Sequence, residues 1–560
     1  MNAPAAADPY LEAIRTLPRE ELLEILGEMT AEEQLDILRE RFRDDLLWMG
    51  AHVWGERFYL PYNVAHEWIA DNLGGLPSWQ ERVAEGQKET CVAVEAPRGL
   101  AKTMFLKLII LRAIAYGTEP YIMWLGGSSD EAVKETRHIR AFLEQPSDEF
   151  VELYGQPRCM GTDKDWFVHM PSQDRPIKVS TRGIPRGRVR GSNYNGQRPT
   201  LVVGDDIEHP DSVRNPRLRD GLTTYINSDV RNAGPKEGGL VWCQFGTRLG
   251  QDSQTARAAK DPAYQAMRFQ AVIQWPHNAG LWEECRELWA DLTDPDRKDT
   301  ACRFYERRRA EMDDGAVVLD EVAQPIYMLY TLLWSKGWYS FLADYQNDPS
   351  DPTRQVFYPS KWRGCTFDGV TITSSKGRRV NLSDCTQALW LDPRASEQVN
   401  RNDWAAIARV AKDRHGYIYV LSVDLRRDNT AGQLARVWGH FEMIGPRALY
   451  GYEDNGFQTL MGKEFDRIKA ERRAAGKAWT CELQGHCSTE NKVDRISSLA
   501  PRIDNGHIEF CTDIPQPVRE QFRQIPTGTH DDGPDAVERA IWLVDGGGTA
   551  QGTSRGSLSG

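Results

Sequence analysis

The chain has 560 residues, a formal net charge of −12 and an apolar fraction of 40%. This length exceeds what one hydrophobic core organises, so two or three domains are expected. The acidic balance excludes a protein covered in positive potential, although it is compatible with a local basic groove for nucleic acid. The sequence shows no apolar run long enough to cross a membrane, no signal-peptide pattern and no paired metal-binding cysteines. We therefore expect an intracellular protein that is neither membrane-bound nor secreted.

Apolar residues recur at helical spacing through the first fifty residues, among acids and arginines. Thr30 and Glu33 have the spacing of a capping box, in which each side chain accepts a hydrogen bond from the backbone N–H of the other residue. We expect residues 1–55 to form a helical arm used for packing or oligomerisation.

A loop between an apolar strand (91–94) and an apolar helix (102–116) has the layout of a phosphate-binding loop. In such a loop, backbone N–H groups face the phosphates, a lysine adds positive charge and a threonine hydroxyl reaches Mg²⁺. Alanines replace the outer glycines of the common motif. We expect that alanine in place of glycine at position 101 costs little stability, because alanine suits the start of a helix. At Ala96 we expect a backbone that does not need positive φ. The loop residues are Ala96, Pro97, Arg98, Gly99, Leu100, Ala101, Lys102 and Thr103.

Residues 175–198 form a glycine-rich basic stretch without a single acid. In an otherwise acidic chain, such a stretch is a candidate for contact with DNA phosphates or with the γ-phosphate of a nucleotide in a neighbouring subunit. A solvated run of charge is the alternative. The basic residues are Arg175, Lys178, Arg182, Arg186, Arg188, Arg190 and Arg198.

An apolar strand at 201–203 ends in three acids, Asp205, Asp206 and Glu208. Beside a phosphate loop, one such carboxylate can hold Mg²⁺ and a second can orient the attacking water. Loop and acids are the two halves of an NTPase signature, so together they predict hydrolysis of a nucleoside triphosphate.

Strands continue to alternate with helices, and the strand at 240–245 ends at Gly246-Thr247, where a small polar side chain can sense the γ-phosphate. This alternation predicts an α/β P-loop NTPase domain over 56–275, with a parallel sheet covered by helices on both faces. Residues 276–352 are expected to form a helical lid or linker.

The second half of the chain has a different pattern: three strands in succession, then helices alternating with strands. This is the order of a ribonuclease H-like fold with a mixed sheet, expected over 353–545. In that topology the fourth strand (448–453) lies parallel to the first (388–392), so Asp392 and Glu453 end side by side. The remaining elements are expected at 404–410, 417–423, 431–443, 457–474, 479–483, 492–499 and 507–510.

The last helix would bring Asp532 and Asp535, one turn apart and next to Asp531, to the same point. Carboxylates that converge without a Lys or Arg partner repel one another, and divalent metals remove that cost. Two ions about 4 Å apart suit phosphodiester hydrolysis. The alternative is that these are ordinary strand-end and helix-cap acids. The Gly/Ser/Thr-rich residues 546–560 are expected to be a disordered tail.

An NTPase half followed by a nuclease half resembles the large terminase subunit of tailed double-stranded DNA bacteriophages, over nearly the whole chain. The segments that carry the resemblance are residues 96–103, Arg190-Gly191, Arg198-Pro199, 203–208, Gly246-Thr247, 345–349, Asp392, Glu453-x-Asn455-Gly456, Lys492-x-x-Arg495-Ile496 and His530-Asp531-Asp532.

The resemblance implies that ATP hydrolysis drives double-stranded DNA into an empty procapsid and that concatemeric DNA is cut with Mg²⁺ or Mn²⁺. Arg98 matches an arginine that the family carries in its loop. The family usually has Glu where this chain has Asp206, whose shorter side chain reaches water less easily, so Asp206 and Glu208 remain alternatives. The residues assigned by resemblance are Lys102 and Thr103 (phosphate, Mg²⁺), Asp205 (Mg²⁺), Gly246-Thr247 (coupling) and Asp392, Glu453 and Asp532 (nuclease metals).

The same resemblance implies partners: the portal protein of the procapsid, a small terminase subunit, and further copies of this chain in a ring, commonly of five. It implies the cytoplasm of an infected bacterial host as the location. A host helicase–nuclease of repair or defence is the alternative enzyme, and a nucleotide-regulated scaffold without turnover is the non-enzymatic alternative.

Overall fold

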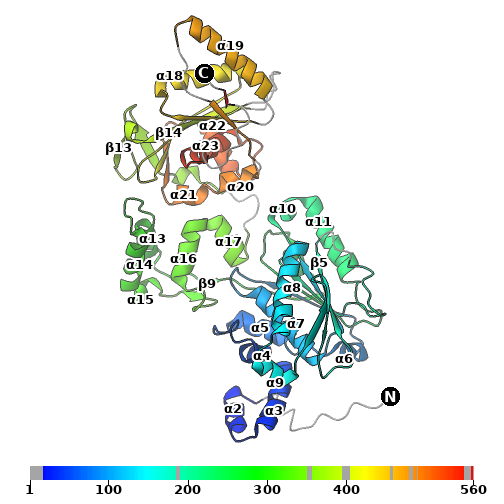
Figure 1. Cartoon of the computed structure of the whole chain (residues 1–560). Helices are drawn as coiled ribbons and strands as arrows, with labels where there is room; N and C mark the ends of the chain where they lie inside the picture. Colours follow the sequence, from blue (N-terminus) through cyan, green and yellow to red (C-terminus); the bar gives the residue numbers. More distant parts are fainter. Residues whose placement is uncertain are drawn as a thin grey trace. The chain divides into compact units, whose positions relative to one another are not determined.

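The structure is a computed structural model, and it divides into two compact units (Figure 1). Unit 1 comprises Met1–Trp275, Gly315–Tyr330 and Ser340–Asp351, and unit 2 comprises Pro276–Asp314, Thr331–Tyr339 and Pro352–Gly560. Residues 276–352, expected as one lid or linker, are thus shared between the units. No described helix is long and apolar enough to span a membrane. The described residues are 17–184, 189–349, 356–393, 404–454, 458–477, 483–488, 490–547 and 557–558.

Unit 1 begins with three helices, α2 (Arg19–Gly27), α3 (Ala31–Asp44) and α4 (Leu46–Val53). The predicted capping box is confirmed: Thr30 and Glu33 each accept a hydrogen bond from the backbone N–H of the other residue. Apolar side chains of α3 and α4 enter the main core of the unit, so this part of the predicted arm packs on its own domain.

An eight-stranded sheet in the order β3-β4-β5-β2-β6-β7-β1-β8 forms the centre of unit 1. Neighbouring strands are parallel except for the two pairs at the β3 edge. The predicted α/β architecture is confirmed, with a sheet that is mostly rather than wholly parallel, because the antiparallel edge strands β3 and β4 were not predicted. The strands are β1 (Glu89–Glu95), β2 (Tyr121–Gly126), β3 (Arg158–Gly161), β4 (Asp165–His169), β5 (Ile177–Gly183), β6 (Leu201–Asp205), β7 (Leu240–Gly246) and β8 (Tyr264–Arg268).

Helices cover both faces of this sheet, as expected for parallel strands whose side chains are apolar on both sides. Strands β2 and β7 are buried along their whole length. One face packs against α5 (Val64–Leu73), α7 (Lys102–Tyr116) and α8 (Ser129–Glu144), and the other against α11 (Pro216–Tyr225) and α12 (Gln254–Ala258). Because α7 follows β1 directly, the loop between them lies at the carboxyl edge of the sheet.

The sheet of unit 2 has the order β13-β12-β11-β19-β16-β15-β14-β17-β18-β20. Strands β14, β15 and β16 are antiparallel, while β17 lies parallel to β14, which confirms the mixed sheet and the parallel first and fourth strands. The strands are β11 (Gly364–Phe367), β12 (Thr371–Thr373), β13 (Arg379–Asn381), β14 (Thr386–Asp392), β15 (Ala405–Lys412), β16 (Ile418–Arg426), β17 (Leu449–Glu453), β18 (Leu483–His486), β19 (Ile508–Cys511) and β20 (Ser557–Leu558).

Two helical layers enclose this second sheet. Helices α18 (Thr430–Ile444) and α19 (Gln458–Ala474) pack on one face, and α22 (Gln516–Gln524) and α23 (Asp532–Val544) on the other. Strands β11–β13 were not predicted. Strand β20 lies in the tail expected to be disordered and pairs with β18; residues 548–556 and 559–560 of that tail are outside the described part.

The other described elements lie outside the two large sheets and the helices named above. They are α6 (Trp79–Ala84), α9 (Asp148–Tyr154), α10 (Pro210–Arg214), the π-helix η1 (Ile226–Val230), β9 (Val272–Gln274), α13 (Ala279–Trp289), α14 (Arg297–Arg307), α15 (Arg309–Met312), β10 (Val317–Val318), α16 (Ile326–Lys336), α17 (Trp338–Gln346), the 3₁₀ turns η2 (Pro359–Lys361) and η3 (Leu382–Asp384), α20 (Lys492–Ser497) and α21 (Ala500–Asp504).

Candidate active sites

The predicted phosphate loop joins the end of β1 to the start of α7. Gly99 has a φ of 86°, and Ala101, the residue before the first turn of α7, has a φ of 54°. The expectation that Ala101 costs little is therefore wrong, because a side chain in the left-handed region costs ~1–2 kcal/mol. Ala96 is not among the residues with positive φ, as expected.

Lys102 is buried, and its ammonium group turns back into the loop. Its Nζ donates to the carbonyl oxygens of Ala96 (2.8 Å) and Pro97 (3.3 Å) and to Oγ1 of Thr247 (2.9 Å). Burial lowers the pKa of Lys102 below its ordinary value, although Asp206 and Asp205 oppose this effect. The charge of the lysine thus lies beside the loop backbone and the end of β7.

Thr103 and Asp205 form the expected pair for a magnesium ion. The Thr103 hydroxyl donates to Asp205 Oδ2 at 2.8 Å. Oδ1 of Asp205 is buried and has no hydrogen-bond partner in the described part of the chain. Burial, reinforced by Asp206, raises the pKa of Asp205 to about 7. A buried carboxylate with one free oxygen next to a hydroxyl fits a hard divalent cation.

The two candidates for orienting water differ in their surroundings. Asp206 has a φ of 40°, and its Oδ1 accepts from the backbone N–H of Thr247 at 3.3 Å. Glu208 is committed elsewhere: its two oxygens accept from the backbone N–H groups of Gln254 (2.6 Å) and Thr255 (3.1 Å) at the start of α12. The geometry favours Asp206, because its carboxylate contacts Thr247 at the cavity, whereas both oxygens of Glu208 accept from the start of α12.

A cavity of about 630 Å³ in unit 1 brings these residues together. Of the loop and acid residues predicted from the sequence, Ala96 and Pro97 are missing from its lining. Arg98 lies at the cavity with its side chain half exposed, and its Nε pairs with Asp344 Oδ1 at 3.0 Å. Asp344 was not predicted, and neither were Glu131 and Glu135 of α8, which also line the cavity, because nothing local marks these acids as site residues.

The positive charge of the basic stretch 175–198 is partly neutralised by a residue outside that stretch. Lys178 and Arg182 of β5 pair with Asp165 of the neighbouring strand β4, at 3.6 Å and 3.1 Å. Arg175 and Arg190 are exposed, whereas Arg186 and Arg188 lie outside the described residues. One acid from another strand therefore compensates part of this positive charge.

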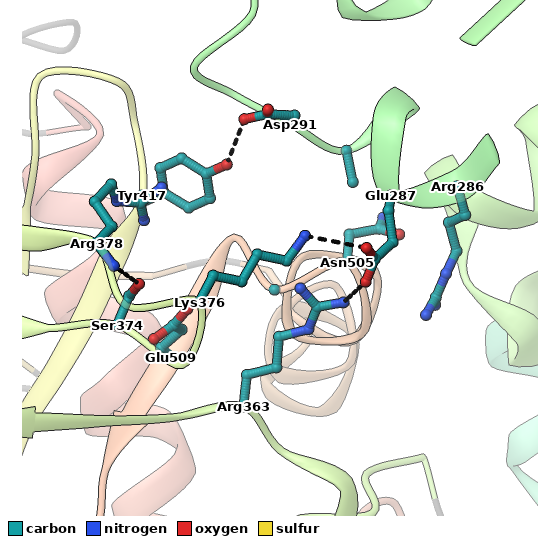
Figure 2. A pocket seen from close by; sticks show the side chains of 12 residues that line it. Arg286, Glu287, Asp291, Arg363, Ser374, Lys376, Arg378, Tyr417, Asn505 and Glu509 are labelled. Atoms are coloured by element: carbon teal, nitrogen blue, oxygen red, sulfur yellow. Dashed lines mark hydrogen bonds and ion pairs between the residues drawn. The ribbon is translucent and has the colours of Figure 1, made fainter. Parts of the chain in front are cut away.

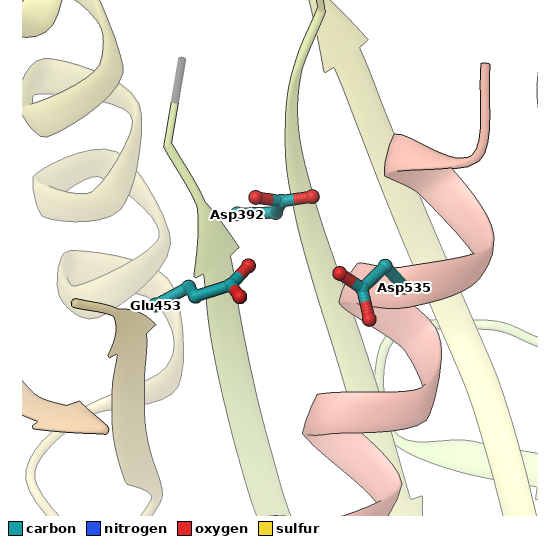
Figure 3. Close-up of side chains that lie close together, drawn as sticks. All are labelled: Asp392, Glu453 and Asp535. Carbon is teal, nitrogen blue, oxygen red and sulfur yellow. The ribbon is translucent and has the colours of Figure 1, made fainter. Parts of the chain in front are cut away.

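Three predicted carboxylates of unit 2 meet at one point (Figure 3). Asp392 ends β14, Glu453 ends the parallel strand β17, and Asp535 lies in the first turn of α23. Their ligand atoms lie within 4.8 Å of one another. Burial raises the pKa of Asp392 well above its ordinary value and also raises that of Asp535. A buried group of carboxylates with raised pKa values fits a cation-binding site.

The expectation that these acids converge without a basic partner is wrong. Lys492, the first residue of α20, places its Nζ 2.9 Å from Asp531 Oδ1, 3.0 Å from Asp535 Oδ2 and 3.6 Å from Asp392 Oδ2. Arg495, one turn later, places Nη2 3.0 Å from Asp535 Oδ1. The one-turn spacing of the two cations was visible in the sequence, but their contact with the acids depends on how α20 packs against α23.

Two acids assigned to the metals lie outside the group of three. Asp531 binds Lys492, as described. Asp532 has a buried Oδ2 without a hydrogen-bond partner among the described residues, and the Nδ1 of His530 lies 3.9 Å from that oxygen. The structure therefore selects Asp535, rather than Asp532, as the third carboxylate of the cluster.

A separate small pocket in unit 2 contains none of the predicted site residues (Figure 2). The side chains of Arg363 and Lys376 each lie 3.5 Å from Glu287 of α13. Tyr417 donates from its hydroxyl to Asp291 at 3.2 Å. These contacts join α13 and the residues after it to the edge of the sheet. The pocket therefore lies at a polar interface between elements of the same unit.

Comparison with known proteins gives a likeness in structure alone. No family model matches the sequence, and no curated protein matches it. A large terminase from a thermophilic bacteriophage, in complex with ADP, is similar over 86% of this chain and 100% of its own, at 8% identity and a TM-score of 0.43. The chain resembles phage large terminases over most of its length.

Two single-domain structures are similar to parts of the chain. The ATPase domain of the Thermus phage P74-26 large terminase covers 52% of this chain and 99% of its own, at 12% identity and a TM-score of 0.26. The Human cytomegalovirus terminase nuclease domain covers 28% and 82%, at 13% identity and a TM-score of 0.22. Each of the three structures has a TM-score below 0.5.

Proposed function

We propose that this chain is the subunit of a viral DNA-packaging motor that hydrolyses ATP to move double-stranded DNA into a procapsid and cleaves concatemeric DNA. The supporting observation is the presence of two complete sites in one chain. Unit 1 has a phosphate loop with an acid pair at the carboxyl edge of a mostly parallel sheet, and unit 2 has three converging carboxylates on a ribonuclease H-like sheet.

For ATP hydrolysis, the backbone N–H groups of the loop and the Lys102 ammonium bind the phosphates. Thr103 and Asp205 hold Mg²⁺, which neutralises phosphate charge when bound. Asp206 orients the attacking water, since its carboxylate is already fixed by Thr247. Arg98 adds a further positive charge at the mouth of the cavity.

Thr247 is suited to couple the nucleotide to the rest of the unit. Its hydroxyl accepts from Lys102, and its backbone N–H donates to Asp206. When Lys102 turns to a phosphate, Thr247 loses one contact and keeps the other. The next residue, Arg248, donates its N–H to Asn347 Oδ1 at 2.9 Å, so the change reaches the segment that leads out of unit 1.

For DNA cleavage, Asp392, Glu453 and Asp535 hold a divalent ion, and their hard oxygen ligands suit Mg²⁺ or Mn²⁺. When bound, the ion activates water and stabilises charge on the scissile phosphate. Asp532, whose buried Oδ2 has no hydrogen-bond partner among the described residues, is available to a second ion.

The proposed partners follow from this role. They are double-stranded DNA, the portal protein of the procapsid, a small terminase subunit and further copies of the chain in a ring, commonly of five. The proposed place of action is the cytoplasm of the infected bacterial host.

The test is ATP turnover with double-stranded DNA and purified portal-bearing procapsids. We expect DNA to stimulate ATP hydrolysis and nuclease-resistant DNA to accumulate in the procapsids. A host helicase–nuclease would instead separate the strands of a forked duplex and protect no DNA. ATP binding without turnover, even with all partners present, would contradict both enzymes.

A further inference from the structure

We propose that the Lys492 ammonium is a resident counter-ion of the unit 2 carboxylates, and that a divalent ion binds there only by taking carboxylate contacts from this lysine. Asp531 then holds the displaced lysine and is not a metal ligand. The inference rests on the proposed role of Asp392, Glu453 and Asp535 as a metal site. It concerns how the chain itself controls entry of the ion.

The contacts of Asp535 carry the argument. This residue is fully buried, and both of its oxygens lie in ion pairs: Oδ2 is 3.0 Å from Lys492 Nζ, and Oδ1 is 3.0 Å from Arg495 Nη2. A metal bond to Asp535 must therefore replace or share one of these cations. The carboxylate cannot turn to a new partner in solvent, because none of its surface is exposed.

Of these two cations, Lys492 is the one whose side chain can move away from Asp535. The Arg495 side chain is 4% exposed and also pairs with Glu538, so it is fixed from two sides. The Lys492 side chain is 35% exposed and has a flexible stem of four carbons. Movement of its Nζ requires no change in the helix that carries it.

Asp531 is suited to hold the lysine after displacement. Its Oδ1 makes the shortest of the three Lys492 contacts, at 2.9 Å, and its side chain is 29% exposed. It is not part of the group whose ligand atoms lie within 4.8 Å of one another. Lys492 can thus leave Asp392 and Asp535 without losing every carboxylate partner, which lowers the cost of making room for an ion.

Charge arithmetic gives the direction of the effect. In the ionised form that binds a metal, Asp392, Glu453, Asp531 and Asp535 carry four negative charges, and Lys492 and Arg495 carry two positive ones. Without the lysine, whose charge would lie a few ångströms from the ion, the site is more negative by one unit of charge. Metal affinity then rises, by about tenfold or more for charges this close.

The experiment measures Mn²⁺ binding to the full chain by isothermal titration calorimetry, with Asp392→Asn used to identify the heat that belongs to this site. Lys492→Met is expected to bind Mn²⁺ about tenfold more tightly than the wild type, and Lys492→Arg to resemble the wild type. The matched control is Lys412→Met. Lys412 lies in the same unit, has a side chain 30% exposed and pairs with Asp545 at 2.8 Å; its loss should leave the affinity unchanged.

Asp531→Asn separates an anchor for the lysine from a metal ligand. If Asp531 anchors the displaced lysine, this change weakens Mn²⁺ binding clearly more in the wild-type background than once Lys492 is Met, where only the loss of one nearby negative charge remains, so the two substitutions are coupled. A metal ligand would instead weaken binding equally in both backgrounds, and that result would overturn this part of the proposal.

Each negative result has a distinct meaning. An Asp392-dependent Mn²⁺ site in the wild type, with equal or lower affinity in folded Lys492→Met, overturns the counter-ion and leaves the metal site standing. No Asp392-dependent uptake in the wild type removes the metal site itself. If Lys492→Met fails to fold, Lys492→Gln, which retains part of the stem and a polar head while losing the charge, is measured against the same expectation.

Discussion

The two sites both place a lysine beside acids at the carboxyl ends of parallel strands, but the lysines have different partners. Lys102 of unit 1 donates to two backbone carbonyls and a threonine hydroxyl, all of them neutral. Lys492 of unit 2 lies among three carboxylates. The same side chain thus serves opposite purposes.

The difference fits the ion that we propose for each site. Burial lowers the pKa of Lys102, and its neutral contacts exchange readily for phosphate oxygens. Burial also acts to lower the pKa of Lys492, but Asp392, Asp535 and Asp531 together raise it above its ordinary value. The first lysine is available to an anion, whereas the second occupies the place of a cation.

The largest expected effect separates the two units. Lys102→Ala should reduce ATP turnover by about 100-fold or more, because a charge directed at the phosphates is lost, and leave plasmid cleavage in Mn²⁺ unchanged. Phosphate release and agarose-gel assays measure the two activities. Lys134→Ala, which removes a 72% exposed lysine from the same cavity, is the control. ATP turnover at the wild-type rate in Lys102→Ala would show that the loop is misassigned.

The reciprocal change tests the second site. Asp392→Ala should reduce DNA cleavage by about 100-fold or more through loss of a metal ligand and leave ATP turnover intact. Asp384→Ala, at an exposed position of the same unit, is the control. Equal loss of both activities would mean that the residue supports the fold rather than the chemistry.

Asp206 and Glu208 should respond in different ways to loss of charge. Asp206→Asn is expected to lower kcat for ATP by about 100-fold with an unchanged melting temperature. Glu208→Gln is expected to cost ~1–2 kcal/mol in the free energy of unfolding, because it weakens the cap of α12, with a smaller change in kcat. The reverse pattern would make Glu208 the residue that orients water.

The raised pKa of Asp205, about 7, predicts a pH dependence. The proton favours the free protein below that pH, and Mg²⁺ requires the ionised carboxylate, so affinity for Mg²⁺–ADP should fall as the pH drops below 7, by up to about tenfold per unit. Above 7 the affinity should level off. Fluorescent-ADP titrations from pH 5.5 to 8.5, with and without Mg²⁺, measure this, and Asp205→Asn should abolish the metal-dependent slope.

The smallest expected effect concerns Ala101. Ala101→Gly removes a side chain from a left-handed position but gives the unfolded chain more freedom, so the net gain in the free energy of unfolding should be at most ~1 kcal/mol. Chemical denaturation of the full chain measures it. A loss of stability would show that the residue does not hold positive φ in solution.

Local patterns were sufficient to predict a large share of this architecture. Each of these local motifs lies within a short stretch of sequence: the loop 96–103, the acids at the end of β6 and after it, and the capping box at Thr30. The order of strands after residue 386 was enough to place Asp392 beside Glu453, because the crossover rules leave few arrangements for that succession of elements.

The sequence by itself thus determined the two kinds of domain and the principal residues of each site. The tertiary structure alone decided that Lys492 lies among the acids, that Asp535 replaces Asp532 in the cluster, that Glu208 caps α12 and that Ala101 adopts positive φ. The physical reason is the same in each case. Hydrophobic periodicity and strand order determine where the backbone runs. The partner of a charged side chain depends instead on how elements far apart in the sequence pack together, and the spacing of residues along the chain does not specify that packing.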